Sequence, residues 1–138
     1  MEIYQKVIAT LRSLSHYYQT AHWVSKGSQY YGDHLLFQRL YDATNVDIDV
    51  VGEKAMGITK SDASVSLKEN IAIMSKILNN MEDNSFSSAL KLEKAFVKLC
   101  DDQAKNALEH SEGVKNMFAG LADKHEGHCY LLQQRVNV

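Results

Sequence analysis

The feature that decides the fold is a short turn between two predicted helices, AHWVSKGSQYYGDHLLF, residues 21–37. Before the turn, apolar residues recur every three or four positions over residues 3–21, which predicts a helix. A cation followed by glycine, Lys26 and Gly27, is typical of a helix end. Asp33 is interpreted as the N-cap of the next helix. The stretch therefore predicts two helices joined by a tight connection.

Working outward from this turn, the chain shows further helical patterns. Apolar periodicity and end signals predict a second helix over 33–57, a short helix over 66–78, a third long helix from residue 86 to about 107, and a last helix after a break at Gly113. Ser66 and Glu69 fit a capping box for the short helix. The sequence thus predicts four long helices and one short one.

Composition indicates a globular, helical protein. The chain has 138 residues, of which 45% are hydrophobic, and it contains no proline. This length is typical of a single domain, 1–138, and the lack of proline favours long unbroken helices. The two cysteines are too few for a disulfide scaffold. Because neither a signal sequence nor an apolar run of membrane-spanning length is visible, we expect a cytoplasmic protein with no membrane partner.

The spacing of the helices selects one fold class. Roughly 28 residues, 57–85, separate the second and third long helices and contain the short helix. Ferritin-like bundles have one such long crossover, whereas up-down-up-down bundles have short loops throughout. We therefore expect an all-α, ferritin-like four-helix bundle with a short helix in the long crossover between helices two and three.

Two of the six histidines flank the first turn. His22 lies about one turn before the end of the first helix, and His34 lies at the start of the second. If the helices pack antiparallel across the turn, the two imidazoles come to similar heights and can flank one site. A single histidine on a helix is more often an ordinary surface or core residue. The pairing of His22 with His34 is what makes these two residues candidates for a functional site.

Two carboxylates, Asp49 and Glu53, share a face of the second helix, and Lys54 is the nearest cation in the sequence. A solvated acidic patch is the simplest interpretation. Asp49 lies 15 residues beyond His34, about 22 Å along a helix axis, so these residues cannot share a metal within one chain. They could share one if a second copy of this helix packed antiparallel across a two-fold axis. Two imidazoles and two carboxylates suit iron or another first-row metal.

Several segments resemble the Dps family, the mini-ferritins named for protecting DNA during starvation. HWVSKG at 22–27 resembles the family's HWxxxG signature, and YYGDHLLF at 30–37 its aromatic turn and second ligand histidine. DVVGEKA at 49–55 is similar to its D-x-x-x-E-R segment, with lysine in place of the usual arginine. NMFAGL at 116–121 and EGHCYLL at 126–132 resemble its last helix. The likeness covers nearly the whole chain.

The resemblance implies a function. Members of this family form hollow dodecamers built from two-fold dimers, and they oxidise ferrous iron at intersubunit sites, typically with hydrogen peroxide, and store it as ferric mineral. The chain would then be a cytoplasmic ferroxidase, an iron-storage oxidoreductase that limits oxidative stress, with hydrogen peroxide or oxygen as oxidant. Carried over by position, His22 and His34 of one subunit and Asp49 and Glu53 of the other would bind non-haem iron.

Two further positions bear on the site. The resemblance places Trp23 close to the metal, where it would supply or trap an electron; the alternative is a buried aromatic anchor. Gln38 stands where the family usually has an aspartate, one turn after the second histidine. Glutamine is neutral and a weaker ligand than carboxylate, so we expect one tight and one weak iron per site. Ordinary ferritins use Glu-x-x-His pairs on two helices, and this chain has none.

Direct DNA binding is expected to be weak or absent. The net charge is −2, so twelve chains would carry about −24, which repels phosphate. No basic tail or patch with interleaved aromatics is visible. Two alternative functions remain: a structural or DNA-associated shell that keeps the fold with weakened or absent oxidation, which Gln38 favours, and a zinc or other metal-binding cage without redox turnover.

Overall fold

The computed structural model describes residues 2–137, so that Met1 and Val138, the ends of the predicted single domain, lie outside the described residues. All regular structure in this range is helical: α1 (Glu2–Val24), α2 (Tyr30–Thr59), the 3-10 helix η1 (Asp62–Val65), α3 (Leu67–Asn79), α4 (Phe86–Ala104) and α5 (Glu112–Val136). Four long helices and a short helix in the connection from α2 to α4 confirm the predicted all-α class. The helices fall into two compact units, divided after Asn84; the single domain stays a prediction.

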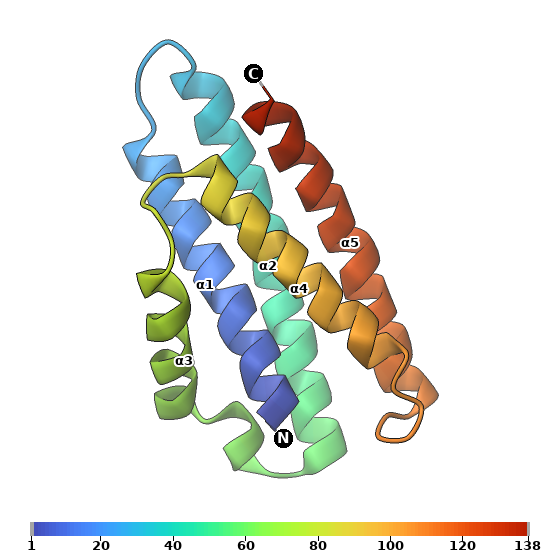
Figure 1. The fold of residues 1–138 in the computed structure, drawn as a ribbon. Coiled ribbons are helices and arrows are strands. Elements are labelled where there is room, and N and C mark those ends of the chain that lie inside the picture. The colour runs from blue at the N-terminus through green and yellow to red at the C-terminus, as the bar shows by residue number, and fades with distance from the viewer. Residues whose placement is uncertain (1, 138) are drawn as a thin grey trace. The chain divides into compact units, whose positions relative to one another are not determined.

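In the first unit, α1 and α2 form an antiparallel hairpin, drawn in blue to green in Figure 1. One stripe of α1 is completely buried, and it contains Val7, Leu11, Leu14 and Tyr18. On α2 the buried residues include Phe37, Leu40, Val51 and Ala55. Burying each of the larger side chains, such as Leu11, Leu14 and Phe37, stabilises the hairpin by about 2 kcal/mol. The hairpin is therefore a rigid support for groups near its turn.

The turn itself differs from the prediction at one residue. The helix α2 begins at Tyr30, with Gln29 at its N-cap and no side-chain cap, so the interpretation of Asp33 as the cap was wrong. Gly27 adopts a φ of 91° and its carbonyl accepts a hydrogen bond from the Tyr30 amide at 3.1 Å, which closes the turn earlier than expected. Asp33 instead lies in the first turn of α2, where its negative charge interacts favourably with the positive end of the helix dipole.

The short helix α3 is held against α1 by a polar network. Asn70 is fully buried, and its amide donates to the Gln5 side-chain oxygen at 2.8 Å and to the Gln5 carbonyl at 3.1 Å. Arg12 donates to the Asn70 Oδ1 atom at 3.0 Å. The predicted cap is also present, because the Ser66 hydroxyl accepts from the Glu69 amide. Satisfied buried amides fix the position of α3 along α1.

The second unit is the α4–α5 hairpin, yellow to red in Figure 1. Ser85 and Ser111 cap the two helices, and their hydroxyls accept from the amides of Ser88 and Val114. α4 ends at Ala104, three residues before the end of the predicted stripe at 107. The apolar interior of this unit includes the fully buried residues Phe96, Phe118 and Leu132. The two caps fix where α4 and α5 begin. They therefore also fix which residues of each helix face the other helix.

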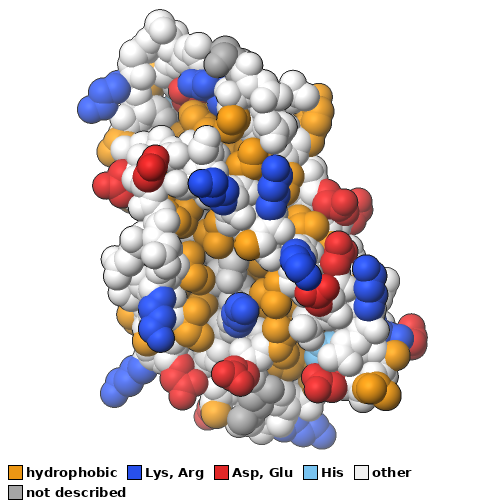
Figure 2. Space-filling model, in the orientation of Figure 1, with side chains coloured by type: hydrophobic (Ala, Val, Ile, Leu, Met, Phe, Trp, Pro, Cys, Tyr) orange, Lys and Arg blue, Asp and Glu red, His pale blue; other side chains and the backbone are white. Residues whose placement is uncertain are grey.

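On the face drawn in Figure 2, the charged side chains show no dominant sign. In Figure 2, Lys and Arg side chains are interspersed with Asp and Glu over the face drawn. On this face, such a mixture gives phosphate no extended basic field to bind. No helix among residues 2–137 is both long and apolar enough to cross a bilayer.

Candidate metal centres

The predicted histidine pair is formed within one chain. The Nδ1 atom of His22 donates to the His34 carbonyl at 2.7 Å, and the Nδ1 atom of His34 donates to the His22 carbonyl at 2.8 Å. Each carbonyl can only accept, so each Nδ1 carries a hydrogen, and in the neutral form of each ring Nε2 keeps a lone pair. The two rings stack with centroids 3.6 Å apart. The turn between α1 and α2 thus presents two imidazoles in the tautomer that binds metals.

Aromatic neighbours hold this pair in place. Tyr30 stacks on His34 with ring centroids 5.0 Å apart, and the edge of Tyr41 meets His22 at 5.4 Å. His22 itself is only 8% exposed. The orientation of both rings is therefore fixed by packing as well as by the hydrogen bonds. Because the rings are already held in place, they would lose little conformational entropy on binding a metal ion.

The predicted acids lie together elsewhere on α2. Asp49 and Glu53 are exposed and line a pocket of about 330 Å³ with Arg12 of α1. Sequence reasoning missed this cation, because only the folded hairpin brings Arg12 to α2. Arg12 is anchored by Asn70. The acids therefore border a pocket with a positive charge, rather than an isolated acidic patch.

Within one chain the histidines and the acids are not brought together. His34 and Asp49 lie on the same continuous helix, 15 residues apart, which is about 22 Å along the axis. Trp23 is 66% exposed, so in the single chain it is not a buried anchor. Gln38 is exposed on α2, one turn after His34. The acids, Trp23 and Gln38 therefore face the outside of the chain, where a second copy could meet them.

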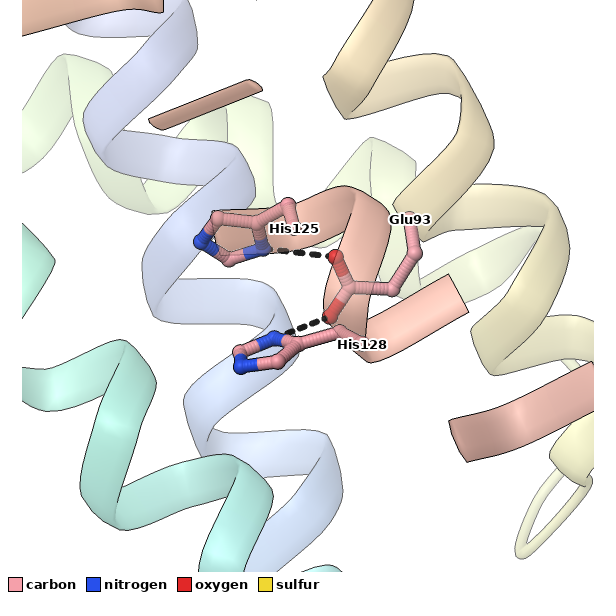
Figure 3. A group of neighbouring side chains, drawn as sticks. All are labelled: Glu93, His125 and His128. Carbon is pink, nitrogen blue, oxygen red and sulfur yellow. Dashed lines mark hydrogen bonds and ion pairs between the residues drawn. The ribbon is translucent and has the colours of Figure 1, made fainter. Parts of the chain in front are cut away.

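A second group of ligands, which sequence reasoning missed, lies inside the α4–α5 hairpin. Glu93 on α4 meets His125 and His128 on α5 (Figure 3). The Nδ1 atom of His125 lies 2.6 Å from Glu93 Oε2, and the Nδ1 atom of His128 lies 3.2 Å from Oε1. The side chains of Glu93 and His125 are fully buried, and that of His128 is 8% exposed. Among the described residues, these three form the cluster suited to a metal ion.

The carboxylate of this cluster is ionised. Burial alone would raise the pKa of Glu93, but hydrogen bonds from His125 and His128 and their charges outweigh it and lower the pKa to about 2. An ionised carboxylate only accepts, so both imidazoles donate from Nδ1. Each oxygen of the Glu93 carboxylate thus accepts a hydrogen bond from a histidine of α5. The cluster is a buried carboxylate held by two imidazole rings.

A signal for this cluster is present in the sequence. Glu93 falls in register within the apolar stripe of α4, between Leu90 and Val97, where a charged residue is unexpected. His125 and His128 are three residues apart, a spacing that places both on one helix face. A carboxylate on an apolar stripe needs a buried partner, but the sequence does not say which helix supplies it.

Comparison with solved structures settles the fold. The structure of Dps from Thermosynechococcus elongatus superimposes with a TM-score of 0.77, covering 98% of this chain and 90% of that chain at 14% identity. This chain has the Dps fold. The predicted ferritin-like four-helix bundle, with its short helix in the crossover, is confirmed. No protein-family model matches the sequence, and no curated protein sequence matches it.

Proposed function

We propose that this protein is an iron-oxidising and iron-storing mini-ferritin. Its substrate is ferrous iron, which binds at sites shared by two subunits. His22 and His34 come from one subunit, and Asp49 and Glu53 come from the other. The oxidised iron is kept as ferric mineral inside a hollow homo-oligomer, a dodecamer built from two-fold dimers. The Dps fold of the chain is consistent with such a shell.

The observation that carries this proposal is the tautomer of the histidine pair. Metal-ligating histidines nearly always donate their second ring nitrogen to a carbonyl or carboxylate, which fixes the ring and frees the other nitrogen. His22 and His34 both do this, each to the other's carbonyl. A surface pair of histidines without a ligand would not need this reciprocal arrangement.

Exposed apolar residues on α2 support the pairing of two subunits through this helix. They lie near both halves of the proposed site and include Leu35, Val46, Val50 and Ile58, each more than 40% exposed. Antiparallel packing of two α2 helices would cover them and would bring the histidines of one subunit toward the acids of the other. The pocket beside Asp49 and Glu53 would then receive the partner's imidazoles.

The residues have separable roles in the reaction. Imidazole nitrogens bind ferrous iron, and the carboxylates balance its charge as it becomes ferric. One hydrogen peroxide takes two electrons, one from each of two ferrous ions, and with two protons becomes two waters. Trp23 lies next to His22 in sequence and is exposed, and we propose that it supplies or traps an electron. Removing iron and peroxide in this way lowers oxidative damage without any contact with DNA.

The deciding experiment measures ferrous oxidation by ultraviolet absorbance, with hydrogen peroxide and with oxygen. The unmodified protein should form ferric iron much faster than a protein-free control, and Glu53→Ala should lose most of that rate. Glu69→Ala, which removes an exposed acid of α3, is the matched control and should keep it. The thermal unfolding transition of each variant is compared so that a loss of folding is recognised.

Two results would overturn the proposal. Oxidation no faster than the protein-free control would move the function to a structural shell or a metal-binding cage without turnover. Equal rates for Glu53→Ala and Glu69→Ala would mean that oxidation occurs away from the proposed interface. A gel shift at low salt tests DNA separately, and we expect weak or no binding because the chain carries a net charge of −2.

A further inference from the structure

We propose that Glu93, His125 and His128 form a second metal site, inside the α4–α5 hairpin, which binds one divalent first-row transition ion such as Zn²⁺ or Co²⁺. This site is separate from the proposed iron-oxidising site, which uses none of these residues. It rests on the convergence of three ligand side chains in a buried position (Figure 3).

The ligand geometry suits such an ion. One ligand atom from each residue lies within 4.8 Å of the others. With bond lengths of about 2.0 Å, the ligand atoms of a tetrahedral ion lie about 3.3 Å apart. The separation between His128 Nδ1 and Glu93 Oε1, 3.2 Å, is close to that edge length, whereas the separation between His125 Nδ1 and Glu93 Oε2, 2.6 Å, would have to lengthen by about 0.7 Å. Small side-chain shifts would therefore convert two hydrogen bonds into metal bonds.

The chemistry of the donors favours transition metals over calcium or magnesium. Two imidazoles and one carboxylate suit Zn²⁺, Fe²⁺ or Co²⁺, whereas calcium and magnesium prefer oxygen. When an ion takes the place of the Nδ1 hydrogens, each neutral ring carries its hydrogen on Nε2 instead. Figure 3 shows both of these nitrogens pointing away from Glu93, so neither is blocked by the carboxylate.

Burial adds to the fit of an ion here. The side chains of Glu93 and His125 are fully buried and that of His128 is 8% exposed, so an ion held by these three ligands would be largely shielded from water. The Phe96 ring packs against His125, with ring centroids 4.6 Å apart.

The test uses the full chain with the surface site disabled. A variant carrying His34→Ala and Glu53→Ala is stripped with a chelator, loaded with Zn²⁺, desalted and analysed for metal. We expect one zinc per chain to remain. Adding Glu93→Gln, which keeps the size of the side chain and removes its charge, should abolish this zinc. Adding Glu126→Gln, an exposed acid on the same hairpin, is the matched control and should leave it.

A second readout covers the case in which Glu93→Gln does not fold. His128 is at the edge of the cluster, so His128→Gln is the milder change. In the same background, Co²⁺ should give the visible absorption of a tetrahedral ion, and His128→Gln should remove it. The proposal is overturned if the starting variant retains no zinc, or if a folded Glu93→Gln or His128→Gln variant binds the metal as before. Neither result depends on ferrous oxidation, so the two proposals fail separately.

Discussion

At the scale of single residues, the partner of each Nδ1 atom distinguishes the two groups of histidines. His22 and His34 donate to backbone carbonyls, which fixes the tautomer but adds no charge. His125 and His128 donate instead to the carboxylate of Glu93. The first pair is therefore held by uncharged backbone groups, as expected for the ligands of the proposed iron site. The second is a permanent part of a charged, buried cluster.

At the proposed iron site, Gln38 is expected to limit how much iron is bound. With two carboxylates per site, the proposed ligands balance the charge of one ferrous ion and not of two. The unmodified protein should bind about one ferrous ion tightly per site, and Gln38→Asp should raise this toward two because the added carboxylate compensates a second ion. Anaerobic titration with Fe²⁺ measures the number. Gln134→Asp, which adds the same charge on α5, should not change it; two tight ions in the unmodified protein would contradict the prediction.

The thiol of Cys129 should react slowly at ordinary pH. Burial raises its pKa to about 11, and the charges of Glu93 and Glu126 add to the effect. Because the thiolate is the reactive form, a raised pKa means that less of it exists below pH 11. At pH 8 alkylation by iodoacetamide should be roughly 100-fold slower than for an ordinary thiol, and it should still be rising between pH 9 and 11.

Mass spectrometry of the Cys129 peptide measures that rate apart from the rate at Cys100, which is fully buried. A reaction at pH 8 as fast as that of a small thiol would show that the pKa is not raised. Unfolding in denaturant should restore the ordinary rate at both positions.

At the scale of elements, local signals predict helices well and their buried partners poorly. The periodic stripes and the Ser66 cap located α3 to within a residue, because both depend on neighbours in sequence. The prediction that Asp33 is the N-cap was wrong because the Gly27 carbonyl accepts from the Tyr30 amide and the helix begins there. The local sequence is compatible with more than one helix start. Glu93 stands in a helical stripe that indicates burial, but its partners come from another helix. The sequence pattern alone does not contain that pairing.

Gly27 is a position where the backbone conformation disfavours a side chain. Its φ of 91° is unfavourable for any residue with a Cβ, although an added Cβ would meet no atom within 4 Å. Gly27→Ala should therefore destabilise the protein by about 1 kcal/mol through backbone strain alone. Gly120→Ala, in open space within α5, should stabilise it by up to about 1 kcal/mol. Urea unfolding of both variants gives the comparison; equal effects would show that the turn is not strained.

At the scale of the whole molecule, the proposed iron site exists only in an assembly. Within the single chain, the proposed ligands His34 and Asp49 lie on one helix, too far apart to bind the same ion. Sequence spacing was enough to predict this separation, because the rise of an α-helix is constant. The two-fold symmetry that joins the halves stays a prediction, since it depends on the surfaces of two chains. A subunit-sharing experiment therefore tests the assembly and the site together.

Subunits defective in different halves should restore one another. His34→Ala lacks a histidine ligand and Glu53→Ala lacks an acid, so each homo-oligomer should be inactive. In a mixed dimer, one site receives both defects and the other receives neither. Random mixing at equal amounts makes half of the dimers mixed, so about a quarter of the normal oxidation rate should return. The two variants are unfolded together, refolded and assayed with peroxide against the same proteins refolded apart. No recovery would mean that the ligands act within one subunit, and recovery in the separately refolded proteins would mean that neither residue is needed.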